Sequence, residues 1–282
     1  MKRSISIVMA YYSRLKQLMF TLKTINLSEY RSDIEVIIVD DASEEDERAG
    51  LIFSSQDRWM WKDLKIKLLT ISQEHRWWKN PCIPFNMGFS KADGKIVLIQ
   101  NPECIHIGDI VKFAVDNVTN ANYITFSVAA LYDMNMVGDL YGLEVNEFFF
   151  ERVCQIVKPE SITNQVTDYV NHWYNHPVHR PLHFHFVSAI TRRNLRSLGG
   201  FDEEYSHGTG WDDAGFVIRI QRKGLKIISI PPDKVFSIHL PHDEVTKIRR
   251  REITPSTLYT NERVFEHRIM GNQLWKVRNS FW

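Results

Sequence analysis

The segment Ile34-Glu35-Val36-Ile37-Ile38-Val39-Asp40-Asp41-Ala42-Ser43 decides the fold of this chain. Its first six residues are almost all apolar and β-branched, which is typical of a strand buried on both faces of a parallel sheet. Two aspartates follow at the point where the apolar run stops. Because ligands of open α/β sheets bind at the carboxyl ends of the strands, we expect Asp40 and Asp41 to border a binding crevice.

Strand-like and helix-like segments alternate on both sides of this stretch. Residues 5–10 form a short apolar run, and apolar residues recur every three or four positions over 15–25, as in an amphipathic helix with Ser13 as its N-cap. The pattern predicts further strands at 64–71, 95–100, 184–190 and 225–230, and further helices at 84–92 and 217–222. This alternation predicts an α/β fold with a mostly parallel, doubly wound central sheet flanked by helices.

Three of the predicted strands end in segments that contain polar residues. These ends are Ala10 to Ser13, Asp40-Asp41 and Asn101-Pro102-Glu103. Since the carboxyl ends of parallel strands meet at one edge of the sheet, we expect the three segments to surround one crevice.

The composition excludes several classes of protein. A length of 282 residues is enough for one large domain or two small ones, and a net charge of +1 gives no general attraction to nucleic acid. The three cysteines lack metal-ligand spacing, and their odd number argues against a disulfide framework, so we expect reduced thiols in a cytoplasmic protein. No stretch is long and apolar enough for a transmembrane helix, and the first apolar run is too short for a signal peptide.

A second informative stretch begins at Gly199-Gly200-Phe201-Asp202-Glu203 and reaches Gly210-Trp211-Asp212-Asp213. It combines a Gly-Gly turn, a glycine-flanked aromatic residue and two adjacent carboxylates. A carboxylate after a mobile aromatic loop suits deprotonation of a sugar hydroxyl, with the ring stacked on the apolar face of the sugar. The same aspartates also suit the first turn of a helix, where they meet the positive end of the helix dipole.

Four motifs follow one another along the chain: Val8 to Arg14, Val39 to Ser43, Asn86-x-Gly88 to Gly94, and Gly199 to Phe216. Together they resemble the inverting nucleotide-sugar glycosyltransferases of the GT-A fold, specifically family 2 with a galactosyltransferase-like C-terminal half. The resemblance covers about residues 4–240. It implies transfer of a sugar from a nucleoside diphosphate, above all UDP, to a hydroxyl group of a glycan or glycoconjugate.

The resemblance also implies roles for individual residues. Asp213 is the implied general base, because in relatives the base is the second acid of the pair. The residues implied to contact the donor nucleotide are Ala10, Tyr12, Arg14, Asp41 and Asn86. Those implied to bind the acceptor are Gly210, Trp211 and Asp212.

The metal motif departs from the family pattern. An Asp-x-Asp that holds a divalent cation against the diphosphate would fall where this chain has Asn101-Pro102-Glu103. Asn offers a carbonyl oxygen and Glu a carboxylate, and both suit Mg²⁺ or Mn²⁺. His239 is the third expected ligand, and His242 competes with it. A strand-end turn that binds no metal is the alternative interpretation.

We expect a single catalytic domain at residues 1–240, followed by a C-terminal helical extension at 241–282. Its nucleotide-sugar-binding half would be 1–103 and its acceptor-binding half 104–240. Acceptor specificity is expected in the irregular segment 131–183.

Two other classes of protein are considered beside this one. A catalytically idle nucleotide- or glycan-binding module would explain the departure at Asn101-Pro102-Glu103. A nucleotidyltransferase would also use a doubly wound sheet and a metal, but the glycine-rich loop that it needs after the first strand is missing from Ala10 to Ser13.

Three further patterns can each be interpreted in two ways, as part of a functional site or as part of the structure alone. His183-x-His185 would place two rings on one face of a strand, as in a zinc pair. Because no third ligand is evident, we expect these rings to pack in the protein or to contact the acceptor instead. Trp77-Trp78 beside Arg76 would border the donor site, with at least one ring in the core. The basic run Lys247 to Arg251 suits a solvated helix face or peripheral contact with an anionic membrane.

Overall fold

The computed structural model describes residues 5–162, 170–242, 254–271 and 273–282. Its strands are β1 Ile5–Tyr11, β2 Ile34–Asp41, β3 Lys65–Ile71, β4 Ile96–Gln100, β5 Cys104–Ile107, β6 Asn122–Phe126, β7 Val128–Ala130, β8 His172–Asn175, β9 Val187–Thr191, β10 Lys226–Ile230 and β11 Phe236–His239. Its helices are α1 Leu15–Ile25, α2 Cys82–Ser90, α3 Ile110–Asn117, α4 Met134–Gly142, α5 Phe149–Val157, α6 Arg192–Leu198, α7 Asp212–Arg222 and α9 Pro255–Ile269.

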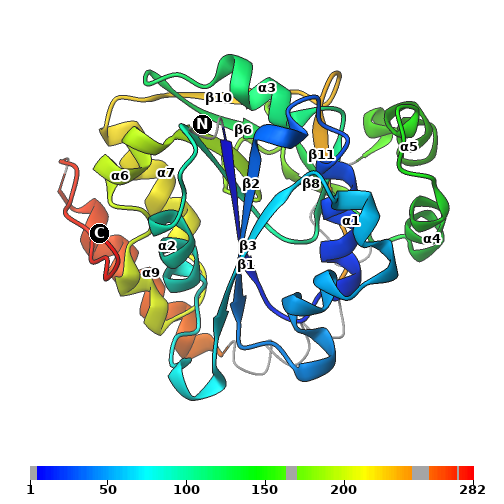
Figure 1. The fold of residues 1–282 in the computed structure, drawn as a ribbon. Coiled ribbons are helices and arrows are strands. Elements are labelled where there is room, and N and C mark those ends of the chain that lie inside the picture. The colour runs from blue at the N-terminus through cyan, green and yellow to red at the C-terminus, as the bar shows by residue number, and fades with distance from the viewer. Residues whose placement is uncertain (1–4, 163–169, 243–253, 272) are drawn as a thin grey trace.

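The central sheet has seven strands in the order β10-β6-β9-β4-β1-β2-β3. Alternate residues of a strand face opposite sides of a sheet. Val8 and Ile37 therefore pack with α2, α6 and α7, whereas Ile7 and Ile38 pack with α1 and α3. Figure 1 shows α2, α6, α7 and α9 on one side of β1 to β3, and α1, α4 and α5 on the other. The predicted α/β fold with helices on both faces of the sheet is confirmed.

One strand departs from the parallel arrangement. β9 lies between β4 and β6 and is antiparallel to both. Its register places Val187 opposite Gln100, at the carboxyl end of β4, and Thr191 opposite Ile96, at the amino end. Residues 184–186 are therefore carried to the sheet edge where β4 ends. An apolar strand pattern does not encode direction, so the sequence did not predict this reversal.

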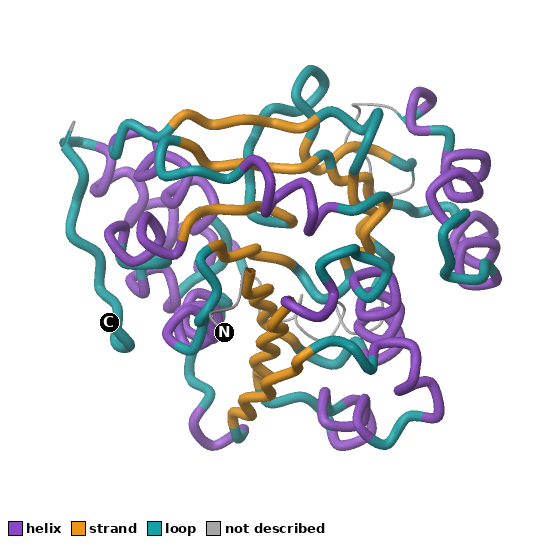
Figure 2. The backbone as a smooth tube through the Cα atoms, turned by 45° about the horizontal axis from the view of Figure 1, so that its top comes forward, coloured by secondary structure: helices purple, strands orange, loops and turns teal. Residues whose placement is uncertain are grey.

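A smaller sheet, in the order β5-β11-β7-β8, was not predicted. The segment 131–183, expected to be irregular, contains α4 and α5 and supplies β8 to this sheet. A separate apolar cluster around Phe149, Trp173 and Phe236 joins these elements. β11 pairs parallel with β7 and antiparallel with β5, which puts His239 opposite Cys104. The strand directions change across the molecule in Figure 2, as twisted sheets require.

The predicted N-cap of α1 is wrong. Arg14 occupies the cap position and makes no side-chain cap. Ser13 has φ of 46°, and its hydroxyl accepts a hydrogen bond from the backbone N–H of Glu44. The Glu47 carboxylate instead accepts the Leu15 N–H at 2.7 Å. An acidic side chain from the loop after β2 therefore satisfies the helix start, where the helix dipole favours negative charge.

Gly94 lies where the chain passes close to β1. A Cβ at this position would lie 2.4 Å from the backbone nitrogen of Ser6 and 2.6 Å from the carbonyl carbon of Ile5. Neither atom moves without shifting β1, so we expect Gly94→Ala to lower the free energy of unfolding by about 1–3 kcal/mol. Gly138→Ala is the matched control, because nothing lies within 4 Å of its Cβ position. Equal urea midpoints for the two variants would contradict this packing argument.

The remaining sequence predictions concern membrane helices, cysteines and the C-terminal region. The described part of the chain contains no helix that is long and apolar enough to cross a membrane. Its three cysteines are free, as the sequence predicted. The basic run Lys247 to Arg251 lies outside the described residues. Within 241–282, helix α9 packs against α7.

Candidate functional site

The carboxyl ends of β1, β2 and β4 border a cleft of about 580 Å³. Its position at this edge of the sheet is the one that the sequence predicted. The predicted site residues that line the cleft are Ala10, Tyr12, Arg14, Asp41, Asn101, Glu103, Asp213 and His239. Four others do not line it: Asn86, Gly210, Trp211 and Asp212.

Glu103 is the centre of a buried polar cluster. It follows β4 in a turn in which the Cys104 N–H donates to the Asn101 carbonyl at 3.1 Å. The register of β11 brings His239 Nε2 to 3.0 Å from Glu103 Oε1, and His242 Nε2 lies 3.5 Å from the same oxygen. One ligand atom from each of these three side chains lies within 4.8 Å of the other two. This spacing lets all three bind one cation.

The electrostatics of Glu103 also fit a cation. Its Oε2 atom is buried and has no hydrogen-bond partner in the described part of the chain. Burial would raise the pKa of this carboxyl, but the Arg14 guanidinium, 2.5 Å away, and the His239 hydrogen bond outweigh burial and hold the pKa of Glu103 well below its usual range. Burial lowers the pKa of His242 to about 3, so its ring is neutral at pH 7. An ionised carboxylate beside a neutral imidazole can bind a divalent cation.

The sequence predicted that His239 and His242 compete for one ligand position, but in the structure both lie beside Glu103. Their rings lie 5.1 Å apart, and both Nε2 atoms face Glu103. Asn101 lies at the same edge of the cleft, where its backbone N–H donates to the Phe186 carbonyl at 3.1 Å. Its role as a metal ligand stays a prediction.

Asp41 forms a polar wall on the other side of the cleft. Trp78 Nε1 donates to Asp41 Oδ1 at 2.9 Å, and Arg76 Nε donates to Oδ2 at 3.4 Å. The Arg76 guanidinium lies 5.7 Å from the centre of the Tyr12 ring. Trp78 is buried whereas Trp77 is 55% exposed, so one of the two rings lies in the core, as expected. The wall thus offers a fixed carboxylate beside an aromatic ring.

Asn86 supports the Gly-Gly turn. It is fully buried, its Nδ2 donates to the Phe201 carbonyl at 2.9 Å, and its Oδ1 accepts the Phe201 N–H at 2.8 Å. Gly199 and Gly200 have φ of 80° and 68°, values that favour glycine. Arg219, also buried, donates to the Gly200 carbonyl at 2.8 Å. Both ends of the Asn86 amide are used within the protein, and its contact with a nucleotide stays a prediction.

Asp213 lines the cleft from the first turn of α7. Its Oδ1 accepts the backbone N–H of His185 at 3.0 Å and pairs with the His185 ring. Burial would lower the pKa of His185, but the charge of Asp213 outweighs burial and raises it. The predicted strand face with His183 and His185 is wrong, because both lie in the loop before β9 and His183 Nδ1 is 3.1 Å from Ser229 Oγ.

Asp212 is buried behind Asp213 and accepts Asn80 Nδ2 at 2.7 Å. Burial, and then the charge of Asp213, raises the pKa of Asp212. Helix α7 begins at Asp212, five residues before the predicted start, so both carboxylates meet the positive end of the helix dipole. The helix-start interpretation is confirmed, and Asp213 is the carboxylate of the pair that lines the cleft.

Trp211 and Gly210 contact α9 instead of the cleft. The Trp211 ring packs against Phe265 with centroids 4.9 Å apart, and the Gly210 carbonyl accepts Asn261 Nδ2 at 2.8 Å. Contact of the Trp211 ring with an acceptor stays a prediction, since the ring does not line the cleft. An exposed ring in a neighbouring loop is Trp77, which pairs with His207 at 5.0 Å.

Sequence reasoning missed the part of the cleft that comes from residues 172–186. Tyr174 and Phe186 stack at 4.7 Å, and Tyr174 lies edge-on to His239 at 4.9 Å. Arg180 lines the cleft with its guanidinium 5.9 Å from the Tyr174 ring. The histidine- and aromatic-rich composition of this segment was a signal, but it has no period that indicates which side chains face a ligand.

Comparison with known families gives an independent result. A family model described as glycosyl transferase family 2 matches residues 6–170, more than half of the chain. No protein with a curated description matches the chain in sequence. The match ends before β9 and α7, so the predicted galactosyltransferase-like C-terminal half stays a prediction.

Solved structures share the fold. TarS of S. aureus is 14% identical, with a TM-score of 0.59 over 95% of this chain and 40% of TarS. Its 1–349 form, solved with UDP-GlcNAc, is 12% identical, with a TM-score of 0.57 over 95% of this chain and 73% of that form. The mannosyltransferase PcManGT from Pyrobaculum calidifontis, in complex with GDP-Man and Mn²⁺, is 19% identical, with a TM-score of 0.52 over 99% of this chain and 66% of that protein. The chain thus spans 40% of TarS and 66% of the mannosyltransferase, and such identities show a common fold alone.

Proposed function

Because the chain belongs to glycosyl transferase family 2 and has the GT-A fold, we propose that it is a metal-dependent, inverting glycosyltransferase. It transfers a hexose or N-acetylhexosamine from a nucleoside diphosphate to a hydroxyl group of a glycan or glycoconjugate. One observation carries the proposal: the Glu103 cluster and Asp213 line the same cleft.

UDP is the proposed donor nucleotide. Asp41 is a fixed hydrogen-bond acceptor at the end of β2, and it suits the uracil N–H or a ribose hydroxyl. Tyr12 and Ala10 line the cleft beside it. TarS has been solved with UDP and UDP-GlcNAc, whereas the mannosyltransferase has been solved with GDP-Man. The experiment described below therefore compares UDP-sugars with GDP-sugars.

Glu103, His239 and His242 would hold Mn²⁺ or Mg²⁺, with Asn101 as a further oxygen ligand. When bound, such a cation neutralises the charge that builds on the leaving diphosphate. The chain supplies two cations of its own beside this position: Arg14, paired with Glu103, and Arg180. Fixed positive groups at the developing charge stabilise the transition state without reorganisation.

Asp213 is the proposed general base. Its carboxylate takes the proton of the acceptor hydroxyl while that oxygen bonds to the anomeric carbon of the donor sugar. The bond from this carbon to the diphosphate oxygen breaks on the opposite face, so the anomeric configuration inverts. The His185 N–H fixes the Asp213 carboxylate at 3.0 Å, which orients it before the acceptor arrives.

The experiment that tests this function measures nucleotide release from a panel of UDP- and GDP-sugars, with Mn²⁺, Mg²⁺ or EDTA. We expect slow release of UDP from at least one UDP-sugar in Mn²⁺ and none in EDTA. Tight donor binding without any release of nucleotide, with or without glycan acceptors, would favour the catalytically idle binding module instead.

Asp41→Asn tests the nucleotide site. The amide keeps the oxygen that accepts Trp78 Nε1 but loses the charge and one acceptor, so we expect the Kd for UDP to rise about tenfold or more. Asp46→Asn is the matched control, because Asp46 is exposed in the following loop. Calorimetric titration with UDP and Mn²⁺ measures both variants. Unchanged affinity in Asp41→Asn would remove Asp41 from the nucleotide site.

A further inference from the structure

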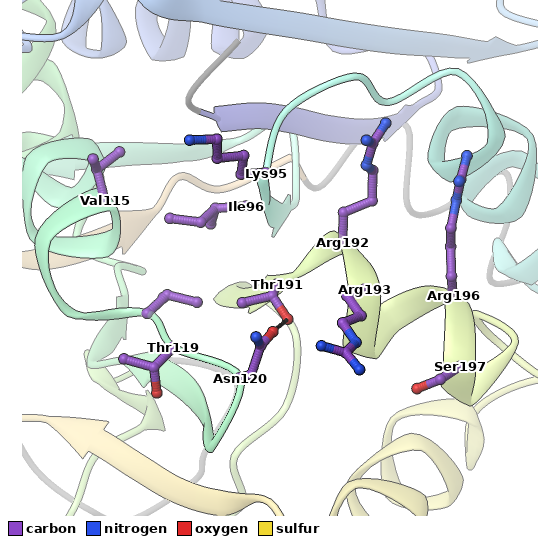
Figure 3. A pocket seen from close by; sticks show the side chains of 11 residues that line it. Lys95, Ile96, Val115, Thr119, Asn120, Thr191, Arg192, Arg193, Arg196 and Ser197 are labelled. Atoms are coloured by element: carbon purple, nitrogen blue, oxygen red, sulfur yellow. Dashed lines mark hydrogen bonds between the residues drawn. The ribbon is translucent and has the colours of Figure 1, made fainter. Parts of the chain in front are cut away.

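A second cavity, of about 1050 Å³, lies at the sheet edge opposite the cleft (Figure 3). It is bounded by the amino end of β4, the carboxyl end of β9, the end of α3 with the loop after it, and α6. Ile96 at the start of β4 lines this cavity, whereas Asn101, just after β4, lines the cleft. At about 3.3 Å per residue, the two sites lie roughly 16 Å apart along the strand. The cavity is therefore a separate site.

The cavity is strongly basic. Four cationic side chains line it, and none of its lining residues in the described part of the chain is acidic. Lys95 directly precedes β4, and the other three, Arg192, Arg193 and Arg196, come from α6. Figure 3 shows these side chains around the cavity from different sides: Arg193 on the side of Asn120, and Arg192 and Arg196 extending from the other side of the helix.

The arginines of α6 form no ion pair with a carboxylate in the part of the chain that the structure describes. Arg192 donates to the Ala92 carbonyl at 2.8 Å, which fixes it without cancelling its charge. The nearby Asp93 is paired with Lys67 at 3.0 Å, and its charge interacts with Arg192 and Arg196 without forming an ion pair with either. Like charges within one helical turn destabilise a helix. A bound anion would remove this repulsion.

The wall of the cavity is ordered by hydrogen bonds. Thr191 Oγ1 donates to Asn120 Oδ1 at 3.0 Å, and Asn194 Nδ2 donates to the Asn120 carbonyl at 3.0 Å. Thr119 and Ser197 add hydroxyl groups to the lining. Apolar side chains of Ile96, Val115 and Val118 complete it. The cavity thus combines guanidinium groups, hydroxyl groups and an apolar floor in one fixed frame.

We propose that this cavity binds a phosphate ester that carries at least two negative charges. Guanidinium groups match phosphate oxygens in charge and geometry, and several of them around one cavity favour a multiply charged anion. The phosphate has two sources: a soluble diphosphate or the headgroup of an anionic lipid. The apolar floor suits the organic part of either ligand. This site does not depend on the function proposed for the cleft.

The test uses the full chain in EDTA, with two probes. Inorganic pyrophosphate is titrated by calorimetry, and vesicles of phosphatidylcholine with or without phosphatidic acid, whose phosphomonoester can carry two negative charges, are used in co-sedimentation. The variant is Arg193→Gln with Arg196→Gln, and the matched control is Lys62→Gln with Lys65→Gln. The control removes the same charge near the edge strand β3, away from the cavity, and both variants leave the cleft unchanged.

We expect the arginine variant to lose binding by roughly a hundredfold, since each charged hydrogen bond lost is worth about tenfold or more. The control keeps the wild-type affinity. Loss of pyrophosphate binding identifies a soluble ligand, and loss of sedimentation that depends on phosphatidic acid identifies a lipid headgroup. The melting temperature of the arginine variant should not fall. The exposed Arg193 and Arg196 side chains repel one another in the wild-type chain, and the substitutions remove this repulsion. Equal binding by the two variants, or no binding of either probe by the wild-type chain, would overturn the proposal.

Discussion

Replacing Glu103 with glutamine is expected to reduce sugar transfer by about a thousandfold and to make UDP binding independent of Mn²⁺. Glu103 is the carboxylate of a cluster whose other members, His239 and His242, are histidines. A neutral amide in its place weakens cation binding, and the charge on the leaving diphosphate then loses its main neutralising partner. A thousandfold loss corresponds to about 4 kcal/mol of transition-state stabilisation.

The controls for this variant separate metal binding from folding. Glu103→Gln leaves the Arg14 guanidinium without its charged partner, and breaking a buried ion pair lowers stability by about 3–5 kcal/mol. Unfolding and metal-free UDP binding are therefore measured on the same sample as Mn²⁺ titration. His242→Gln keeps the carboxylate and is expected to lose less activity. Wild-type affinity for Mn²⁺ in folded Glu103→Gln would show that Glu103 is not a ligand.

The sequence predicted those parts of the fold that depend on local pattern. The run Ile34 to Val39 is buried on both faces of the sheet, so its continuous apolar character was sufficient to place β2 inside the sheet, between β1 and β3. The direction of β9 and the existence of the smaller sheet depend on pairings between distant segments, such as Val187 with Gln100 and His239 with Cys104. Residue pattern does not encode such pairings.

The residues of the candidate site also differ in how well the sequence predicts their positions. Residues at the ends of strands were placed correctly, because the backbone alone carries Ala10, Asp41 and Glu103 to the cleft. The direction of a side chain is harder to predict from the sequence. Asn86 and Trp211 point to partners on distant segments, Phe201 and Phe265, which the local sequence does not indicate.

Asp213→Asn is expected to lower kcat by about 10²–10⁴-fold, the usual contribution of a general base. The amide keeps the oxygen that accepts the His185 N–H, so the carboxamide lies where the carboxylate did but does not take a proton. The Kd for the UDP-sugar should barely change, because the interaction that is lost is with the acceptor proton. Turnover and donor affinity are measured on the same variant.

Asp212→Asn and the pH profile distinguish the two carboxylates. Burial and the charge of Asp213 raise the pKa of Asp212 to about 6, so the pair takes up a proton as the pH falls toward that value. Proton uptake removes the form in which both carboxylates are ionised, and kcat should therefore fall below about pH 6 and level off above it. In Asp212→Asn, which keeps the oxygen that accepts Asn80 Nδ2, the fall should begin at a lower pH while most activity at pH 7.5 survives. If Asp212→Asn is inactive and Asp213→Asn turns over normally, the base is the buried carboxylate and the acceptor must reach it by a rearrangement of the Gly210–Trp211 loop.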